Sequence, residues 1–214
     1  MRRYMVVNAK GGCGKSTLAT NIAAYFASQW ENVNVTLADF DPQQSSMDWL
    51  SVRPEERPAI TGINAHADGL RGLNPHTDFL VMDAPASTHG PDLTAIMKHA
   101  ETVLIPVLPS TIDMRAATRF IEEIRNVGKV SRKEVKIGVV ANRVREHYSI
   151  FQELEEFLKS QPVQVVGHLR DAQNYVRAYG AGLGVWELAP YQAWQEWQQW
   201  EPIAQWMESK KSQP

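Results

Sequence analysis

Short apolar runs alternate with longer amphipathic stretches along most of the chain. Runs rich in Val, Ile and Leu predict strands at 3–8, 33–39, 59–65, 78–83, 102–107, 135–141 and 163–168. Apolar residues at helical spacing predict helices at 15–29, 91–99, 112–127, 147–160, 170–179 and 191–208. This alternation is typical of an α/β fold, a mainly parallel twisted sheet with helices on both faces. We therefore expect one domain over residues 1–214, with ligands at the carboxyl ends of the strands.

The composition is ordinary for a globular protein, and it excludes several classes of protein and site. Of the 214 residues 43% are hydrophobic and 21% are charged, and 22 basic against 24 acidic residues leave a net charge of −2. This excludes a globally basic nucleic-acid coat but not a local basic patch. The single cysteine, Cys13, excludes an internal disulfide and a two-cysteine metal or iron–sulfur site. No apolar run approaches the roughly 18 residues of a membrane span, so we expect a cytoplasmic protein.

A glycine-rich loop with two lysines lies between the first predicted strand and the first helix. It reads Lys10-Gly11-Gly12-Cys13-Gly14-Lys15-Ser16-Thr17. The order of strand, loop and helix is that of a phosphate-binding loop, although Ala9 stands where the general motif has its first glycine. The glycines allow backbone N–H groups to approach phosphate oxygens at a helix N-terminus. Lys15 is expected to reach the β- and γ-phosphates of ATP, Ser16 to bind Mg²⁺ and Thr17 to bond the α-phosphate.

The additional lysine, Lys10, distinguishes this loop from the general phosphate-binding motif. The run KGGCGKST resembles the deviant Walker A motif of the ParA/MinD family, closest to the small ParA-type partition and positioning ATPases. Later segments resemble that family in the expected order over residues 1–187: Asp39-Phe40-Asp41-Pro42-Gln43, FLVMD followed by Ala84-Pro85, the run VLIPVLPSTIDMRAA, and GVVANRV. The resemblance implies a P-loop ATPase that hydrolyses ATP weakly, stimulated by a partner, with ATP and Mg²⁺ as cofactors.

The resemblance also implies roles for single residues. Asp41 is expected to orient the attacking water, and Asp39 and Asp83 to hold Mg²⁺ through its waters. Lys10 is expected to reach the ATP of the partner subunit, so that the site is complete only in an ATP-dependent homodimer. Asn142 stands at the position that relatives use to read adenine. The alternatives remain a turn residue before Pro42 for Asp41, and a helix or turn cap for Asp83.

Three further residues near the phosphate loop have a structural role or an undecided one. Asp113 is favoured as the N-terminal cap of the helix 114–127. Cys13 is favoured as a small filler of the loop, although a helix N-terminus and a nearby lysine can make a thiol reactive. Arg170 is ambiguous between packing near adenine and contacting DNA.

Basic residues cluster late in the chain despite the net charge. Between 125 and 145 they are Arg125, Lys129, Arg132, Lys133, Lys136, Arg143 and Arg145, opposed by Glu134. Arg177 lies in HLRDAQNYVRAYGAGLGVWE, which resembles the family segment whose arginines bind double-stranded DNA phosphates without reading sequence. We expect Arg177, Arg143 and Arg145 to contact nucleoid DNA. The alternative is an ordinary solvated surface.

Five of the seven tryptophans lie in the last thirty residues. A stripe at helical spacing runs through Tyr191, Trp194, Trp197, Trp200, Ile203 and Met207, with a break or restart expected at Pro202. A membrane-surface helix would carry lysines and arginines on its polar side, whereas this one carries glutamines and glutamates. We therefore expect the helix 191–208 to pack on the domain or in a dimer, and membrane binding is disfavoured.

Two further functions are weighed against a ParA-type positioning ATPase. A metabolic ATP-dependent ligase of the same superfamily is disfavoured because the phosphate loops of these ligases generally lack a lysine at the position of Lys10. An iron-protein reductase is disfavoured because it needs two cysteines per subunit, and this chain has one. A MinD-like membrane-cycling ATPase is disfavoured by the C-terminal helix. The resemblance also implies a cargo adaptor, a ParB-like activating protein, with the cargo a plasmid or a protein body such as a carboxysome or chemotaxis cluster.

Overall fold

The computed structural model describes residues 1–145 and 148–214. Within them one sheet contains the strands β1 (Arg2–Val6), β2 (Val35–Asp39), β3 (Ile60–Asn64), β4 (Phe79–Asp83), β5 (Thr102–Val107), β6 (Lys136–Val144) and β7 (Gln164–Arg170). Their order is β3-β2-β4-β1-β5-β6-β7, and every neighbouring pair is parallel. The predicted α/β fold and all seven predicted strands are confirmed.

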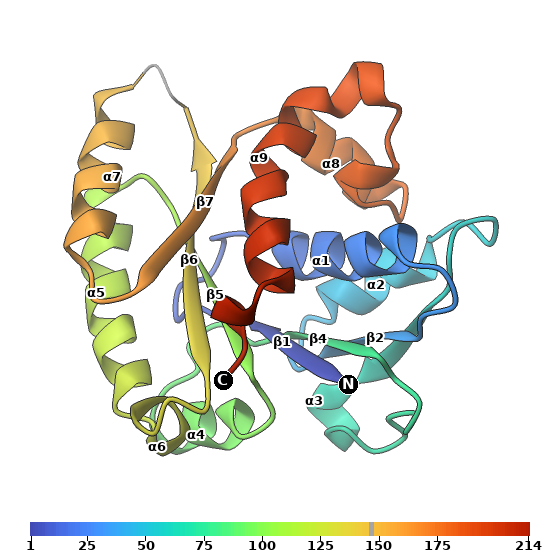
Figure 1. Ribbon diagram of the computed structural model, residues 1–214, viewed down its shortest axis with the longest axis horizontal. Helices are drawn as coiled ribbons and strands as arrows, with labels where there is room; N and C mark the ends of the chain where they lie inside the picture. The colour runs from blue at the N-terminus through green and yellow to red at the C-terminus, as the bar shows by residue number, and fades with distance from the viewer. Residues whose placement is uncertain (146–147) are drawn as a thin grey trace.

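Helices cover both faces of the sheet (Figure 1). They are α1 (Lys15–Gln29), α2 (Ser45–Ser51), α3 (Ala65–Asp68), α4 (Gly90–Met97), α5 (Thr111–Arg125), α6 (Gly128–Ser131), α7 (Ser149–Ser160), α8 (Gln173–Gly180) and α9 (Pro190–Glu208), with 3₁₀ turns η1 (Val185–Glu187) and η2 (Lys210–Ser212). One apolar core lies under α4, α5 and α7, and the other lies under α1, α2, α8 and α9. The start predicted for the helix 147–160 lies outside the described residues.

Three short helices, α2, α3 and α6, are absent from the sequence prediction. The longest of them, α2, has 7 residues, too few for a helical period to stand out. Two strands also extend beyond their predicted ends, β6 to Val144 and β7 to Arg170, so α8 begins at Gln173 and not at 170. These extensions carry polar residues to the strand ends that border the functional site.

Ser110, and not Asp113, is the N-terminal cap of α5. The Ser110 side chain accepts a hydrogen bond from the backbone N–H of Asp113, at 3.1 Å. Its own hydroxyl also donates to the Asp113 carboxylate. The predicted cap is therefore wrong: α5 begins at Thr111, and Asp113 lies within its first turn, where a carboxylate interacts favourably with the helix dipole.

The C-terminal helix packs on β7, but its aromatic residues do not form the single predicted stripe. Trp200, Ile203 and Met207 are fully buried as expected, whereas Tyr191 is 81% exposed and Trp194 is 52% exposed. The non-helical backbone lies at Ala193, with φ −126° and ψ 17°, and the helix continues through Pro202. A break at Ala193 rotates the first turn away from the core, and burial on both sides of Pro202 keeps the later turns continuous.

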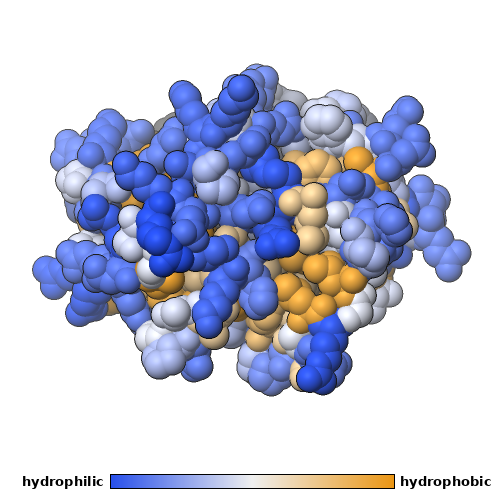
Figure 2. Space-filling model, turned by 60° about the horizontal axis from the view of Figure 1, so that its bottom comes forward, coloured by the Kyte–Doolittle hydropathy of each residue, from blue (hydrophilic) through white to orange (hydrophobic). Residues whose placement is uncertain are grey.

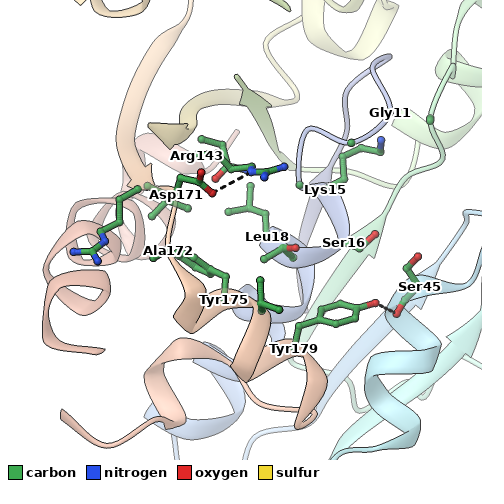
Figure 3. Close-up of a pocket in the computed structure, with 18 of the residues that line it drawn as sticks. Gly11, Lys15, Ser16, Leu18, Ser45, Arg143, Asp171, Ala172, Tyr175 and Tyr179 are labelled. Carbon is green, nitrogen blue, oxygen red and sulfur yellow. Dashed lines mark hydrogen bonds and ion pairs between the residues drawn. The ribbon is translucent and has the colours of Figure 1, made fainter. Parts of the chain in front are cut away.

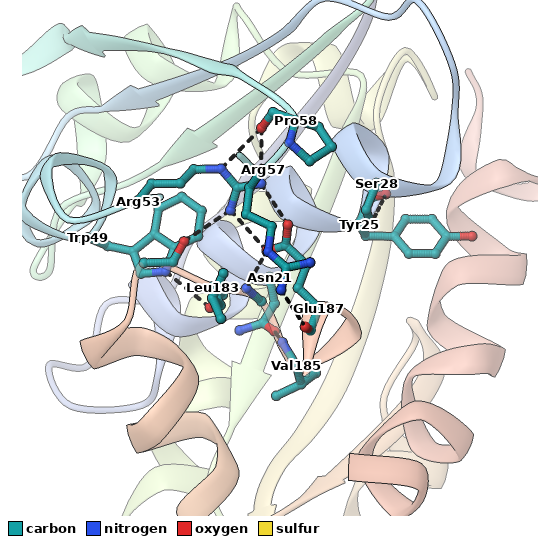
Figure 4. A network of polar contacts seen from close by, with 12 residues as sticks. Asn21, Tyr25, Ser28, Trp49, Arg53, Arg57, Pro58, Leu183, Val185 and Glu187 are labelled. Carbon is teal, nitrogen blue, oxygen red and sulfur yellow. Dashed lines mark hydrogen bonds and ion pairs between the residues drawn. The ribbon is translucent and has the colours of Figure 1, made fainter. Parts of the chain in front are cut away.

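A buried ion pair ties the loop after α2 to the C-terminal part of the chain (Figure 4). Arg53 makes two hydrogen bonds to the Glu187 carboxylate, at 2.7 and 2.9 Å, and the two side chains are 5% and 2% exposed. Its guanidinium also lies over the Trp49 ring, 5.4 Å from the centroid, which is within the reach of a cation–π contact. The segment 52–58 after α2 lies at the surface and is anchored by this buried arginine side chain.

Hydrophilic residues predominate on the face shown in Figure 2, with hydrophobic residues gathered to the right of centre. Among the described residues, no helix combines the length and the apolar character needed to cross a membrane.

Candidate nucleotide-binding site

A cavity of about 620 Å³ opens at the carboxyl ends of the strands, beside the N-terminus of α1 (Figure 3). It is lined by the glycine-rich loop and α1 (Gly11, Gly12, Gly14, Lys15, Ser16, Thr17, Leu18), the segments after β2 and β4 (Asp41, Gln43, Ser45, Ala86), the end of β6 (Asn142, Arg143), and β7 through α9 (Leu169, Arg170, Asp171, Ala172, Tyr175, Val176, Tyr179, Trp200). This volume is in the range that holds a drug-sized or nucleotide-sized ligand.

The loop between β1 and α1 needs glycine for conformation and for space. Gly12 and Gly14 adopt φ of 74° and 91°, the left-handed region that glycine favours. A Cβ atom on Gly14 would lie 2.4 Å from Nδ2 of Asn142, which donates a 2.8 Å hydrogen bond to the Cys13 carbonyl. Gly14 is also the N-cap of α1 and has no side chain to bond the first-turn N–H groups. Those groups are therefore available to an anion.

The two lysines of the loop point in different directions. Lys15 is buried, and its Nζ donates to the Lys10 carbonyl at 3.1 Å, beside the cavity that Lys15 lines. Lys10 does not line the cavity. Its Nζ lies 3.8 Å from a carboxylate oxygen of Asp113, and its side chain is 38% exposed. Asp113 thus has a partner on the loop, a contact that its interpretation as a helix cap missed.

Asp83 ends β4 as a fully buried carboxylate. Its Oδ2 accepts a 2.7 Å hydrogen bond from the Ser46 hydroxyl, and its Oδ1 has no partner among the described residues. Burial raises the pKa of Asp83 to about 7, partly opposed by the nearby Ser16 and Ser46 hydroxyls. An unpaired buried carboxylate oxygen near a serine hydroxyl offers the hard oxygen donors that Mg²⁺ prefers. No group of three His, Cys, Asp or Glu in the described part of the chain could hold a metal alone. Remaining ligands would have to come from nucleotide or water.

Asp39 at the end of β2 is fully buried, and backbone N–H groups occupy both of its oxygens. Oδ1 accepts from Asp41 at 2.9 Å, and Oδ2 accepts from Ser46 at 2.8 Å and Met47 at 3.4 Å. Burial raises the pKa of Asp39, and these N–H groups oppose the rise. Asp39 therefore accepts from backbone N–H groups in the first turn of α2, whose N-cap is Gln44, and it does not line the cavity. Its role in holding Mg²⁺ through water stays a prediction.

Asp41 lines the cavity and joins the segments after β2 and β4. One carboxylate oxygen accepts from the backbone N–H of Gln43 at 2.9 Å, and the other from that of Ala86 at 3.3 Å. Asp41 is therefore a turn residue, as the alternative interpretation of this position predicts. It also lines the cavity together with Lys15 and Ser16. A carboxylate in this place can accept a hydrogen bond from water within the cavity.

The opposite end of the cavity is built from β6, β7 and the segment after β7. Arg143 lies 3.5 Å from Asp171, as Figure 3 shows, and Arg145 contacts the same carboxylate at 2.8 Å. Arg170 lies 3.2 Å from the buried Glu196 carboxylate on α9. Arg143 and Arg170 therefore border the cavity, while Arg177 is exposed on α8 and does not. Contacts of Arg143, Arg145 and Arg177 with DNA stay predictions.

Several lining residues escaped the sequence analysis. Tyr175 and Tyr179 are four residues apart on α8, and this spacing is the signal that could have found them. The Tyr175 hydroxyl accepts from Trp200 Nε1 at 3.0 Å, and the Tyr179 hydroxyl donates to the Ser45 carbonyl at 2.6 Å (Figure 3). Ser45 begins α2, which carried no sequence signal.

Cys13 is fully buried, and its thiol donates to the Lys10 carbonyl at 3.3 Å. Burial raises the pKa of this thiol despite the nearby Lys15. A thiol that stays protonated is a poor nucleophile, in agreement with the interpretation of Cys13 as a filler.

The parallel sheet, the glycine loop and the cavity at the N-terminus of α1 define a P-loop nucleotide-binding protein. Residues 4–185 match the CobQ/CobB/MinD/ParA nucleotide-binding domain, and the chain belongs to this family. It is 31% identical over 189 residues to maintenance of carboxysome distribution protein A of Halothiobacillus neapolitanus, covering 86% of each chain. It is also 46% identical over 55 residues to the chromosome-partitioning ATPase Soj of Thermus thermophilus, covering 26% of this chain and 21% of Soj.

Solved structures share the fold at lower identity. The McdA–ATP complex of Cyanothece superposes with a TM-score of 0.71 at 16% identity, covering 95% of this chain and 96% of that one. MinD of Aquifex aeolicus gives 0.70 at 16% identity, covering 98% of each. Cobyrinic acid a,c-diamide synthase of Mycobacterium smegmatis gives 0.67 at 19% identity, covering all of this chain and 98% of that one. These structures therefore confirm the fold and do not choose among the three candidate functions.

Proposed function

We propose that the chain is an ATP-hydrolysing positioning protein of the ParA type. The observation that carries this proposal is the cavity that brings the glycine loop, Lys15 and Asp41 together. Similarity to carboxysome-distribution proteins over most of the chain supports cargo positioning over metabolic ligation. We expect the protein in the cytoplasm, associated with the nucleoid.

In the proposed site the phosphates of ATP lie over the N-terminus of α1. Backbone N–H groups of Gly11, Gly12, Cys13 and Gly14, with the side chains of Lys15 and Thr17, would bind the phosphates. Ser16 would bind Mg²⁺ directly, and Asp39 and Asp83 through water; the cation would neutralise charge on the phosphate oxygens. Asn142, which bonds the Cys13 carbonyl of the loop, and Arg170 would lie against the base.

Asp41 is proposed to orient the water that attacks the γ-phosphorus. Its two hydrogen bonds to backbone N–H groups leave carboxylate lone pairs for water on the cavity side. Lys10 is proposed to act on the ATP of a second subunit, so that hydrolysis requires a dimer. The 3.8 Å contact with Asp113 is weak and partly exposed, so leaving it would cost Lys10 little.

The ATP-bound dimer is proposed to bind double-stranded DNA without sequence preference, through Arg177 and the Arg143–Arg145 region. A ParB-like cargo adaptor would stimulate hydrolysis and release the dimer from DNA. Arg177 is the more available contact, because Arg143 and Arg145 share the Asp171 carboxylate. These two pairs are largely exposed, and exposed pairs are weak enough to exchange for phosphate.

The Asp41→Ala variant tests the hydrolytic role. We expect it to bind ATP and dimerise as the unchanged protein does, while phosphate release falls by about 100-fold or more, within the range of a lost acid–base group. Nucleotide binding by fluorescence, dimerisation by analytical ultracentrifugation and phosphate release are measured on the same preparation. A variant that hydrolyses at the original rate, or that cannot bind ATP, contradicts the proposed role.

The Arg177→Glu variant tests DNA binding, with Arg71→Glu as a matched control. Both arginines are exposed, and Arg71 comes three residues after the end of α3, a helix that lies far from α8 in Figure 1. We expect only Arg177→Glu to weaken retention on random DNA with ATP at moderate salt, and both variants to dimerise. Equal retention of the two variants would refute the assignment of Arg177. Retention on liposomes in place of DNA would support the membrane-cycling alternative.

A further inference from the structure

A second cavity, of about 480 Å³, lies on the surface between α1, η1 and α9. It is lined by Tyr25, Gln29, Trp186, Trp194, Trp197, Gln198, Glu201, Ala204 and Gln205, and we call it the aromatic groove. It shares no lining residue with the nucleotide cavity. Four of its nine lining side chains are aromatic, which is far more than the 9% of aromatic residues in the chain.

Three of the four rings of the groove, those of Tyr25, Trp186 and Trp197, are held in place by contacts within the chain. Tyr25 and Trp186 lie 5.0 Å apart between centroids, and Trp186 and Trp197 lie 6.2 Å apart. Trp197 Nε1 donates to the Val185 carbonyl at 2.7 Å, and the Tyr25 hydroxyl donates to Glu208 at 2.6 Å. The Tyr25 ring points toward α9 in Figure 4. Rings that are already fixed lose little entropy when a ligand binds.

The charge of the groove favours a cation. Glu201 is the one charged side chain in the lining, and it is exposed. The faces of indole and phenol rings carry negative potential, which attracts ammonium and guanidinium groups. An aromatic lining with a carboxylate at its edge therefore complements a positive side chain.

Elsewhere in the molecule, arginine side chains of this chain lie over its own aromatic rings. Arg53 lies over Trp49 at 5.4 Å, and Arg2 lies over Tyr4 at 5.1 Å. None of the described arginines or lysines occupies such a position over the aromatic residues of the groove. The rings of the groove therefore have no cation–π contact from the described part of the chain, and the Trp194 side chain is 52% exposed.

We propose that the aromatic groove binds an arginine or lysine side chain from an extended basic segment of a partner protein. The cation lies against the rings of Trp194 and Trp197, and Glu201 pairs with it at the edge. Glutamine side chains along the groove (Gln29, Gln198, Gln205) offer hydrogen bonds to the peptide backbone. This site does not rest on the proposed ATPase activity, because it shares no lining residue with the nucleotide cavity.

The test uses the full chain without nucleotide and a short fluorescent Gly/Ser peptide with several arginines. A second peptide carries citrulline, which has the shape of arginine without its charge. Fluorescence polarisation at low salt compares the unchanged protein with Trp194→Ala and Glu201→Gln. Trp30→Ala is the matched control, since Trp30 is 47% exposed and lies outside the groove.

We expect the arginine peptide to bind more tightly than the citrulline peptide, and Trp194→Ala to weaken it by about fivefold, as for an exposed cation–π contact. Trp30→Ala should leave the affinity unchanged. Far-ultraviolet circular dichroism confirms that each variant is folded. Equal binding of both peptides, or equal effects of Trp194→Ala and Trp30→Ala, would overturn the proposal. Self-association that Trp194→Ala abolishes, measured by sedimentation, would also overturn it, because a second copy would then fill the groove.

Discussion

Replacing Asp83 by asparagine removes a buried carboxylate whose ionisation opposes folding. In the folded protein its pKa rises from 3.8 to about 7, chiefly because of burial. A rise of one pKa unit corresponds to about 1.4 kcal/mol, so the charged form costs the fold about 4 kcal/mol well above pH 7. An asparagine keeps an oxygen that can accept from Ser46 and carries no charge at any pH.

The sign of this effect follows from which state holds the proton. Below about pH 4 the carboxyl is protonated in both states, and it contributes no pH dependence. As the pH rises from 4 to 7, the unfolded chain loses the proton first, so stability falls by up to about 1.4 kcal/mol per pH unit. Above pH 7 the folded protein loses the proton as well, and the penalty stays constant.

We therefore expect the stability gained by Asp83→Asn to grow by about 3 kcal/mol between pH 5 and pH 8.5. The assay is urea unfolding followed by circular dichroism, with EDTA and no nucleotide, since a bound cation would favour the carboxylate. Comparing variant with unchanged protein at each pH cancels other titrating groups, such as Asp39 and His99, whose pKa values are raised and lowered respectively by burial. Asp68→Asn, at an exposed site, is the control. A difference that does not vary with pH would refute the reasoning.

Two further substitutions test the loop and the buried ion pair. Gly14→Ala should lower ATP affinity by at least about tenfold in equilibrium binding, because a Cβ at φ 91° costs about 1–2 kcal/mol and meets Asn142 at 2.4 Å. Gly180→Ala, where a Cβ meets nothing within 4 Å, should bind ATP normally, and equal affinities would contradict this account. Arg53→Ala should lower the free energy of unfolding by about 3–5 kcal/mol in urea, because it leaves Glu187 buried and unpaired. A loss below about 1 kcal/mol would place this pair among weak surface contacts.

The parts of the site that are local in sequence could be predicted from it. The loop from Lys10 to Thr17 takes its shape from its own glycines and from the strand and helix that flank it. The alternation of apolar runs likewise predicted all seven strands, since strands buried on both faces are almost uniformly apolar.

Features that depend on distant partners could not be predicted in this way. The first turn of α2 is stabilised by hydrogen bonds from its backbone N–H groups to the Asp39 carboxylate. Its 7 residues contain no apolar pattern that would predict a helix. Tyr175 reaches the cavity because α8 packs beside α9, where Trp200 donates to its hydroxyl. Asp113 meets Lys10 because β1 and β5 are neighbours in the sheet, although the two residues are far apart in the chain.

The sequence by itself determined the order of strands and helices, the phosphate loop and the family. These follow from periodicity and from motifs whose parts lie within a few residues of one another. Tertiary structure alone decided which carboxylates are buried, which arginines already have partners, and which tryptophans remain exposed. The stripe along α9 shows the reason: one change of backbone angle at Ala193 sends Trp194 to the surface while Trp200 enters the core. Burial and charge pairing depend on what packs against a residue, and the neighbours of these residues come from distant parts of the chain.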